Sequence, residues 1–263
     1  RNREDILNEV KSLKAEGIKE ITLLGQNVNS YGKDKYPDYG FAELLEDVAK
    51  TKIPRIRFMT SHPKDISDKL LEVMSKYPNI AKHLHLPAQS GSNKVLESMN
   101  RKYTRERYLE IVNKARKLMP QLAFSTDIIV GFPTETNEDF EDTIKLLKEV
   151  EYDMIFSFIY SKRKGTPAAK MERALTHDEI MQNFNRMLEV QSEIALRKNQ
   201  EMVGKVYEVL VEGESKNNKD LLTGRTDSNK IVHFEGDKSL VGSFVNIKII
   251  KAQTYFLFGE IIN

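Results

Sequence analysis

The feature that most constrains this sequence is the fivefold alternation of a helical pattern with a short apolar run. Apolar residues at helical spacing predict helices over 4–16, 41–49, 66–77, 104–119 and 136–150, each followed by a predicted strand, over 18–24, 55–60, 83–86, 123–130 and 154–160. Strands separated by helices form parallel sheets with right-handed crossovers, and strands this apolar are covered on both faces. We therefore expect an α/β fold, either a barrel or an open doubly wound sheet.

The residues that follow each predicted strand favour the barrel. Every strand ends in a polar or Gly/Pro cluster, and the clusters in chain order read GQNVNSYG, SHP, PAQSGS, GFPTET and SKRKGTP. In barrels of parallel strands the active site is built from the segments at the carboxyl ends of the strands. We expect these clusters to meet at one rim and to hold a ligand there.

The pattern changes after a long predicted helix over 176–200. From about residue 203, β-rich runs over 205–211, 231–234, 243–252 and 255–262 are separated by turn sequences such as FEGDKSLVG. This pattern predicts a small β-barrel of about 60 residues, similar in size to an OB-like module. We expect two domains, over 1–200 and 201–263.

Composition excludes several classes of protein. The 41 Lys and Arg nearly balance the 39 Asp and Glu, so any contact with nucleic acid must come from a local patch. Apolar runs fall short of the roughly 18 residues of a membrane span, and we expect a cytoplasmic chain without membrane contact. The chain has no cysteine, which excludes disulfides and thiolate-held metals within it. Because it starts without Met inside a helical pattern, we interpret it as part of a longer protein.

Several side chains at the predicted rim could bind a polar ligand. Gln89 and Ser90 lie in a dense polar turn after a buried strand, and Arg101 soon follows. A guanidinium there suits a bidentate contact with a carboxylate, although a solvated Arg fits the residues equally well. Asp127 is an acidic residue inside an apolar strand, where burial is costly unless the carboxylate has partners. No nucleophile–His–Asp set, P-loop or Rossmann fingerprint is present, which argues against hydrolases and kinases.

Four segments, over 25–32, 85–106, 125–140 and 160–169, closely resemble the methylthiotransferase branch of the radical S-adenosylmethionine enzymes. The run GQNVNSYG is more similar to the members that modify tRNA than to those that modify a ribosomal protein. The tail LTGRTDSNKIVHFEG resembles the TRAM module of the tRNA-modifying members. The resemblance covers essentially the whole chain.

The resemblance implies a partial (β/α)6 barrel that lacks its first strand, followed by a small all-β TRAM barrel. It further implies that a CxxxCxxC loop ahead of this chain binds a 4Fe–4S cluster that cleaves S-adenosyl-L-methionine, and that an N-terminal domain supplies a second 4Fe–4S cluster. The implied reaction adds a methylthio group to C2 of N6-isopentenyladenosine at position 37 of tRNA, with an electron donor and the anticodon stem-loop as partners. Since neither cluster would be ligated by this chain, we expect it to be inactive alone.

The resemblance also assigns roles to residues. Gln89 and Asp127 match positions near the ribose or methionine part of S-adenosyl-L-methionine, and Arg101 matches one near its carboxylate. Further cofactor-binding candidates on the same rim are Gln26, Asn27, Ser61, Ser90 and Ser125, with Phe132 and Pro133 near the adenine. No catalytic side chain and no metal ligand are expected, because the protein mainly orients the cofactor.

In the second domain, Lys205, Arg225 and Lys230 are the candidate RNA contacts. Two alternatives remain: methylthiolation of a ribosomal protein, and a noncatalytic RNA-binding module.

Overall fold

The computed structural model describes all residues except 60, 217 and 263. In it, five parallel strands form the sheet of the larger domain. The strands are β1 (Glu20–Leu23), β2 (Arg55–Phe58), β3 (His83–His85), β4 (Ala123–Val130) and β5 (Met154–Ile159). β1 pairs with β2, β3 with β4 and β4 with β5, and a parallel bridge between Ile56 and Ile80 joins the two parts. The predicted α/β fold is confirmed. The prediction for residue 60 lies outside the described residues.

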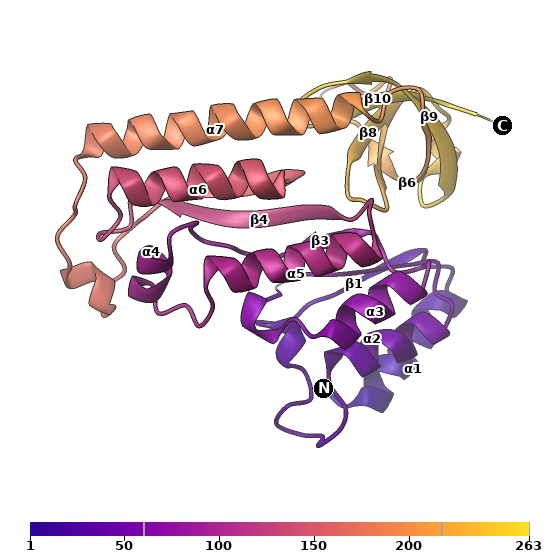
Figure 1. Cartoon of the computed structure of the whole chain (residues 1–263). Coiled ribbons are helices and arrows are strands. Elements are labelled where there is room, and N and C mark those ends of the chain that lie inside the picture. The colour runs from indigo at the N-terminus through magenta and orange to yellow at the C-terminus, as the bar shows by residue number, and fades with distance from the viewer. Residues whose placement is uncertain (60, 217, 263) are drawn as a thin grey trace.

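Helices alternate with the strands, as predicted, and cover the outer face of the sheet (Figure 1). They are α1 (Arg3–Ala15), α2 (Phe41–Lys50), α3 (Asp68–Lys76), α4 (Asn93–Ser98), α5 (Arg105–Leu118), α6 (Asn137–Val150) and α7 (His177–Gln200). Side-chain hydroxyls of Thr104, Thr136 and Thr176 cap α5, α6 and α7. The six-residue α4 was not predicted, because it lies inside a polar segment that reads as a turn.

Alternation along β4 separates the two faces of this sheet. Thr126, Ile128 and Val130 are buried against the helices, whereas Asp127 and Ile129 on the opposite face are only partly buried. Among the described residues β1 pairs only with β2 and β5 only with β4, so the sheet does not close. The concave face of a partial barrel is therefore open to a ligand.

The smaller domain is a closed barrel of five strands in the order β10-β8-β7-β6-β9. Its strands are β6 (Val206–Glu214), β7 (Leu222–Thr226), β8 (Ile231–Phe234), β9 (Phe244–Ala252) and β10 (Leu257–Ile261). The predicted small barrel is confirmed, but β7 was missed because LTGRT reads as a turn. Gly224 is required there, since an added Cβ would lie 2.3 Å from the Leu210 carbonyl oxygen. The boundary between residues 200 and 201 stays a prediction.

The small barrel docks on the end of the sheet where the strands begin, away from α4 (Figure 1). The Arg57 guanidinium donates to the carbonyl oxygens of Thr226 at 2.6 Å and Asp227 at 2.8 Å. The Asp153 carboxylate, just before β5, pairs with Lys198 at 2.7 Å and Lys230 at 2.9 Å.

Within the described part of the chain, no helix combines the length and apolar character needed to cross a membrane.

Candidate cofactor site

Two adjoining cavities lie at the carboxyl ends of the strands. One, of about 670 Å³, is lined by Gln89, Arg101 and Asp127 together with Phe132, Phe158, Tyr160 and Arg163 among others. The second, of about 230 Å³, shares Gln89, Arg101 and Asp127 and adds Gln26, Asn27 and Ser61. The structure thus brings together seven of the ten predicted cofactor-binding side chains, and the three best candidates lie where the cavities meet.

Backbone hydrogen bonds fix Gln89 beside Asp127. The Gln89 amide donates to the Asp127 carbonyl oxygen at 2.8 Å, and the Ile129 amide donates to the Gln89 carbonyl oxygen at 2.9 Å. Gln89 adopts a φ of 67°, which is costly for a residue with a side chain and which turns the chain at the strand end. This pairing holds both side chains at the rim.

Arg101 is a cation without an ionic partner among the described residues. It follows α4, and its amide donates to the Leu96 carbonyl oxygen at 2.8 Å. Its Nε is buried and makes no hydrogen bond in the described part of the structure. A partly buried guanidinium with free donors is well suited to bind a carboxylate.

The second cavity contains further polar atoms without partners. Asn27 donates through Nδ2 to the Asp65 carboxylate at 2.6 Å, but its Oδ1 is buried without a hydrogen bond among the described residues, as is the Ser61 hydroxyl. Each buried polar group of this kind costs about 1–3 kcal/mol. Three such groups around one cavity indicate a site shaped for a polar ligand.

The turn after β4 places Phe132 against the larger cavity. Gly131 adopts a φ of 74°, and the Phe132 ring packs edge-on against Tyr160 with centroids 5.1 Å apart. Glu135 holds this turn, since its carboxylate accepts from the Gly131 amide at 2.5 Å. Burial raises the pKa of Glu135 to about 7. Pro133 does not line the cavity; its carbonyl oxygen accepts from the Ala174 amide at 2.8 Å.

Two of the predicted serines are enclosed by protein. The Ser90 hydroxyl lies 3.4 Å from the Thr143 hydroxyl, and the Ser125 hydroxyl contacts His83 Nε2 and His85 Nδ1, both at 2.9 Å. Neither lines the two cavities, and their roles as cofactor contacts stay predictions.

His85 is a site residue that the sequence analysis missed. Its Nε2 lies 3.6 Å from Asp127 Oδ1, so a line of polar groups runs from Asp127 through His85 and Ser125 to His83. Burial lowers the pKa of His83 to about 3, which keeps this end of the line neutral. The spacing of His83 and His85 on one face of a strand was the available signal.

The three predicted RNA contacts have different surroundings. Lys205 is exposed and has no ion pair among the described residues. Arg225 pairs with Glu212 at 3.0 Å, whereas Lys230 is mostly enclosed at the domain interface, where it pairs with Asp153 at 2.9 Å. Burial lowers the pKa of Lys230. Their contact with RNA stays a prediction, and the position of Lys230 favours a structural role for it.

The described residues offer no set of ligands for a metal cluster. The chain contains no cysteine, and the described residues include no group of three or more His, Asp or Glu placed to hold a metal ion. The side chains present fit a polar cofactor at the rim, and they do not fit an iron–sulfur cluster.

The fold and the candidate site together define an α/β partial-barrel protein with two polar-lined cavities at the carboxyl rim, joined to an OB-like barrel. The sequence model of the Radical SAM superfamily matches residues 1–147, and that of the TRAM domain matches residues 200–262. The chain belongs to the radical SAM superfamily, as the sequence resemblance predicted.

Curated relatives narrow this class. The chain is 55% identical over 261 residues to a tRNA-2-methylthio-N(6)-dimethylallyladenosine synthase of Clostridium botulinum (strain Langeland / NCTC 10281 / Type F), covering 99% of this chain and 58% of the relative. It is 54% identical to the protein of that name from Bacillus licheniformis, covering 100% of this chain and 52% of the relative. The chain therefore spans about half the length of these relatives.

A solved structure supports the fold alone. Coproporphyrinogen III oxidase (HemN) from Escherichia coli, described as a radical SAM enzyme, superposes with a TM-score of 0.54 at 13% identity. The match covers 86% of this chain and 59% of that chain.

Proposed function

We propose that this chain is the S-adenosyl-L-methionine-binding and tRNA-binding region of an enzyme that adds a methylthio group to C2 of N6-isopentenyladenosine at position 37 of tRNA. The observation that carries the proposal is the position of the Arg101 guanidinium beside Asp127 and Gln89, where two cavities meet, without a hydrogen-bond or ionic partner among the described residues. The names of the relatives and the TRAM match support tRNA as the substrate. They favour it over a ribosomal protein.

The rim residues match the chemical groups of the cofactor. S-adenosyl-L-methionine supplies the radical chemistry when it is bound next to a reduced iron–sulfur cluster. Arg101 binds the carboxylate of its methionine part, because a guanidinium can donate two parallel hydrogen bonds. Asp127 and Gln89 bind hydroxyl or ammonium groups, and Phe132 with the turn at Gly131 forms an apolar wall for the adenine. Asn27 and Ser61 orient the polar end of the ligand.

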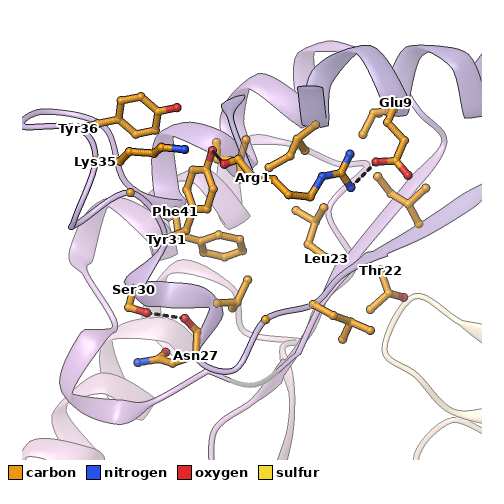
Figure 2. A pocket seen from close by; sticks show the side chains of 18 of the residues that line it. Arg1, Glu9, Thr22, Leu23, Asn27, Ser30, Tyr31, Lys35, Tyr36 and Phe41 are labelled. Carbon is orange, nitrogen blue, oxygen red and sulfur yellow. Dashed lines mark hydrogen bonds and ion pairs between the residues drawn. The ribbon is translucent and has the colours of Figure 1, made fainter. Parts of the chain in front are cut away.

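The cluster is supplied by another part of the whole protein. A cavity of about 570 Å³ lies along the edge of β1 that faces away from β2, and Leu23, Tyr31 and Phe41 surround it (Figure 2). We propose that a further strand of the longer protein pairs with this edge and that cysteines following it hold the cluster. The cavity is mostly apolar, although the Arg1–Glu9 ion pair lies in it, and a cavity beside a strand edge that has no partner among the described residues is suited to receive such a strand. Without that segment the chain is inactive.

The remaining partners follow from this reaction. We propose that the substrate is the anticodon stem-loop of tRNA, that a cellular electron donor reduces the cluster, and that the enzyme acts in the cytoplasm, where tRNA is modified.

The test compares variants of the full-length protein in cells that lack the endogenous enzyme. Wild type should restore 2-methylthio nucleosides in bulk tRNA, measured by mass spectrometry, and Arg101→Ala and Asp127→Ala should abolish most of the signal. Arg107→Ala is the matched control, because Arg107 lies on α5 and pairs only with Glu110 among the described residues. Undiminished modification by both rim variants would reject the site, and a methylthiolated ribosomal protein with unmodified tRNA would reject the substrate.

A further inference from the structure

The outer surface of the small barrel carries a row of aligned side chains on three neighbouring strands. Phe258 on β10 is directly opposite His233 on β8 and Lys251 on β9. Their chain neighbours Val232, Phe234 and Leu257 are buried in the barrel core. Since side chains alternate between the two faces of a strand, the row points outward.

Aromatic rings gather along this row. The His233 ring lies 5.2 Å from that of Phe256 and 5.9 Å from that of Phe258, and the rings of Phe256 and Phe258 are 5.5 Å apart, measured between centroids. All three rings are partly exposed. A cavity of about 610 Å³ opens beside them, lined by His233, Phe258 and Lys251, with Ile250 (48% exposed) and Glu260 at its margin. Apolar rings exposed on a sheet surface are costly unless a partner covers them.

Positive charge lies next to the rings. The Lys251 ammonium is 5.8 Å from the centre of the Phe258 ring. Lys248 is exposed on the same strand, and Lys205 is exposed just before β6, which pairs with β9 at Lys248. None of these three lysines has an ion pair within the described part of the chain. Glu235 and Glu260 also line the cavity, and Glu260 is directly opposite Lys248, so the three lysines leave a small excess of positive charge on this side of the barrel.

This face is not used by the contact between the domains. The docking bonds come from Glu208 on β6, from residues 225–230 between β7 and β8, and from the turn between β9 and β10, where Asn199 donates to the Gln253 and Thr254 carbonyl oxygens. The aromatic row lies on β8, β10 and β9, and within the described part of the chain His233, Phe256 and Phe258 make no hydrogen bond or ion pair with the larger domain. It is therefore available to a partner while the two domains stay together.

We propose that His233, Phe256 and Phe258 form a stacking platform for unpaired bases of RNA, with Lys251, Lys248 and Lys205 contacting the adjacent phosphates. This proposal rests on the proposed function, which makes tRNA the substrate, and it identifies the surface and the part of the RNA that binds there. Flat rings next to ammonium groups suit single-stranded nucleic acid, because each base offers a face for stacking and each nucleotide carries a phosphate. A paired duplex hides its base faces and would gain only the phosphate contacts.

The test measures binding of this chain to three fluorescein-labelled RNAs by anisotropy: a hairpin with a seven-nucleotide loop, a single strand of the same loop sequence, and a blunt duplex. The hairpin and the single strand should bind more tightly than the duplex. Phe258→Ala and His233→Ala should weaken loop binding by about 5- to 140-fold without changing the salt dependence, since this is the range of one lost base stack. Lys251→Ala should instead lower the slope of log affinity against log salt by about 0.7.

Matched variants separate the platform from a general loss of structure. Phe258→Tyr keeps a ring and should bind within about twofold of wild type. Val241→Ala removes an exposed apolar side chain and Lys219→Ala an exposed charge, and neither residue belongs to the row or to the cavity lining, so both variants should bind as wild type. Circular dichroism of each variant checks that the barrel remains folded.

The outcomes distinguish this proposal from the proposed function. If wild type binds the hairpin but Phe258→Ala and His233→Ala bind it equally well, the platform is wrong and tRNA binding stands. Equal affinity for duplex and loop also overturns the platform alone. If wild type binds none of the RNAs, both the platform and the assignment of this barrel to tRNA binding fail, and a protein partner becomes the explanation of the exposed rings.

Discussion

Replacing Glu135 by Gln should remove a pH-dependent loss of stability that the buried carboxyl imposes on the fold. Glu135 is 1% exposed, its Oε2 accepts from the Gly131 amide, and its Oε1 has no partner among the described residues. Burial raises its pKa from 4.5 to about 7. Because the folded pKa lies above the unfolded one, the penalty is absent below about pH 4.5, grows as the pH rises, and is complete above about pH 7.

The size of this effect follows from the shift. About 2.5 units at 1.36 kcal/mol each give an upper value of about 3 kcal/mol, of which roughly 2–3 kcal/mol should develop between pH 5 and pH 8. A glutamine has the shape of the protonated acid and keeps an oxygen for the Gly131 amide, so the penalty should not develop in the variant. Relative to wild type, Glu135→Gln should therefore become more stable on going from pH 5 to pH 8 by this amount.

The assay is urea unfolding of both proteins at the two pH values, followed by circular dichroism. The difference between the proteins cancels every other titrating group that the substitution leaves unchanged. Glu193→Gln is the control, because Glu193 is exposed on α7 and should give the same difference from wild type at both pH values. An unchanged difference for Glu135→Gln would show that the buried carboxyl is solvated or paired in solution, and the argument for its raised pKa would fail.

Three further predictions test the turn, the domain contact and the rim. Gly131→Ala should destabilise the chain by about 1–3 kcal/mol in thermal unfolding, because φ is 74° and the new Cβ would lie 2.8 Å from Ile180; an unchanged melting temperature would contradict this. Arg57→Met should lower the free energy of unfolding by about 2–4 kcal/mol and expose the segment after α7 to trypsin, because two carbonyl oxygens and Glu20 lose their buried partner. Resistance to trypsin equal to that of wild type would count against the role of Arg57 in docking. Arg101→Lys should weaken S-adenosyl-L-methionine binding about tenfold in calorimetry of the full-length protein, as a single ammonium replaces a bidentate fork, and equal affinity would refute that contact.

Periodicity was sufficient to predict the sheet and the edge at which the polar turns converge. Parallel strands end at a common edge, so polar turns after successive strands had to converge, and Gln89, Arg101 and Asp127 do lie around the same two cavities. The same argument could not predict which polar side chains line a cavity and which are enclosed by other side chains. Ser125 and Asp127 share a face of β4, but only Asp127 lines the cavities, whereas the Ser125 hydroxyl is buried in contact with His83 and His85 on the neighbouring strand.

The sequence analysis could not predict side-chain contacts between segments that are far apart in the chain. Lys230 and Asp153 lie on different domains, and nothing in their local sequence shows that they pair. The alternation of Arg55 and Arg57 in a buried strand was the available signal, because two guanidinium groups on one face need polar partners. Those partners turned out to be backbone carbonyls of the small barrel. β7 was missed because its core-facing positions include Gly224, which contributes no apolar side chain to the pattern.

The arrangement of the two domains limits what kind of RNA could reach both of the proposed binding surfaces. The small barrel docks where the strands begin, whereas the cofactor cavities lie where they end (Figure 1). β4 has 8 residues, so roughly 26 Å of sheet separates the two ends at about 3.3 Å per residue. A single nucleotide cannot span that distance, and a folded RNA of about eight stacked base pairs can. An RNA that reached both surfaces would therefore be long and structured, and the unpaired bases on the barrel and the nucleotide at the rim would come from different parts of it.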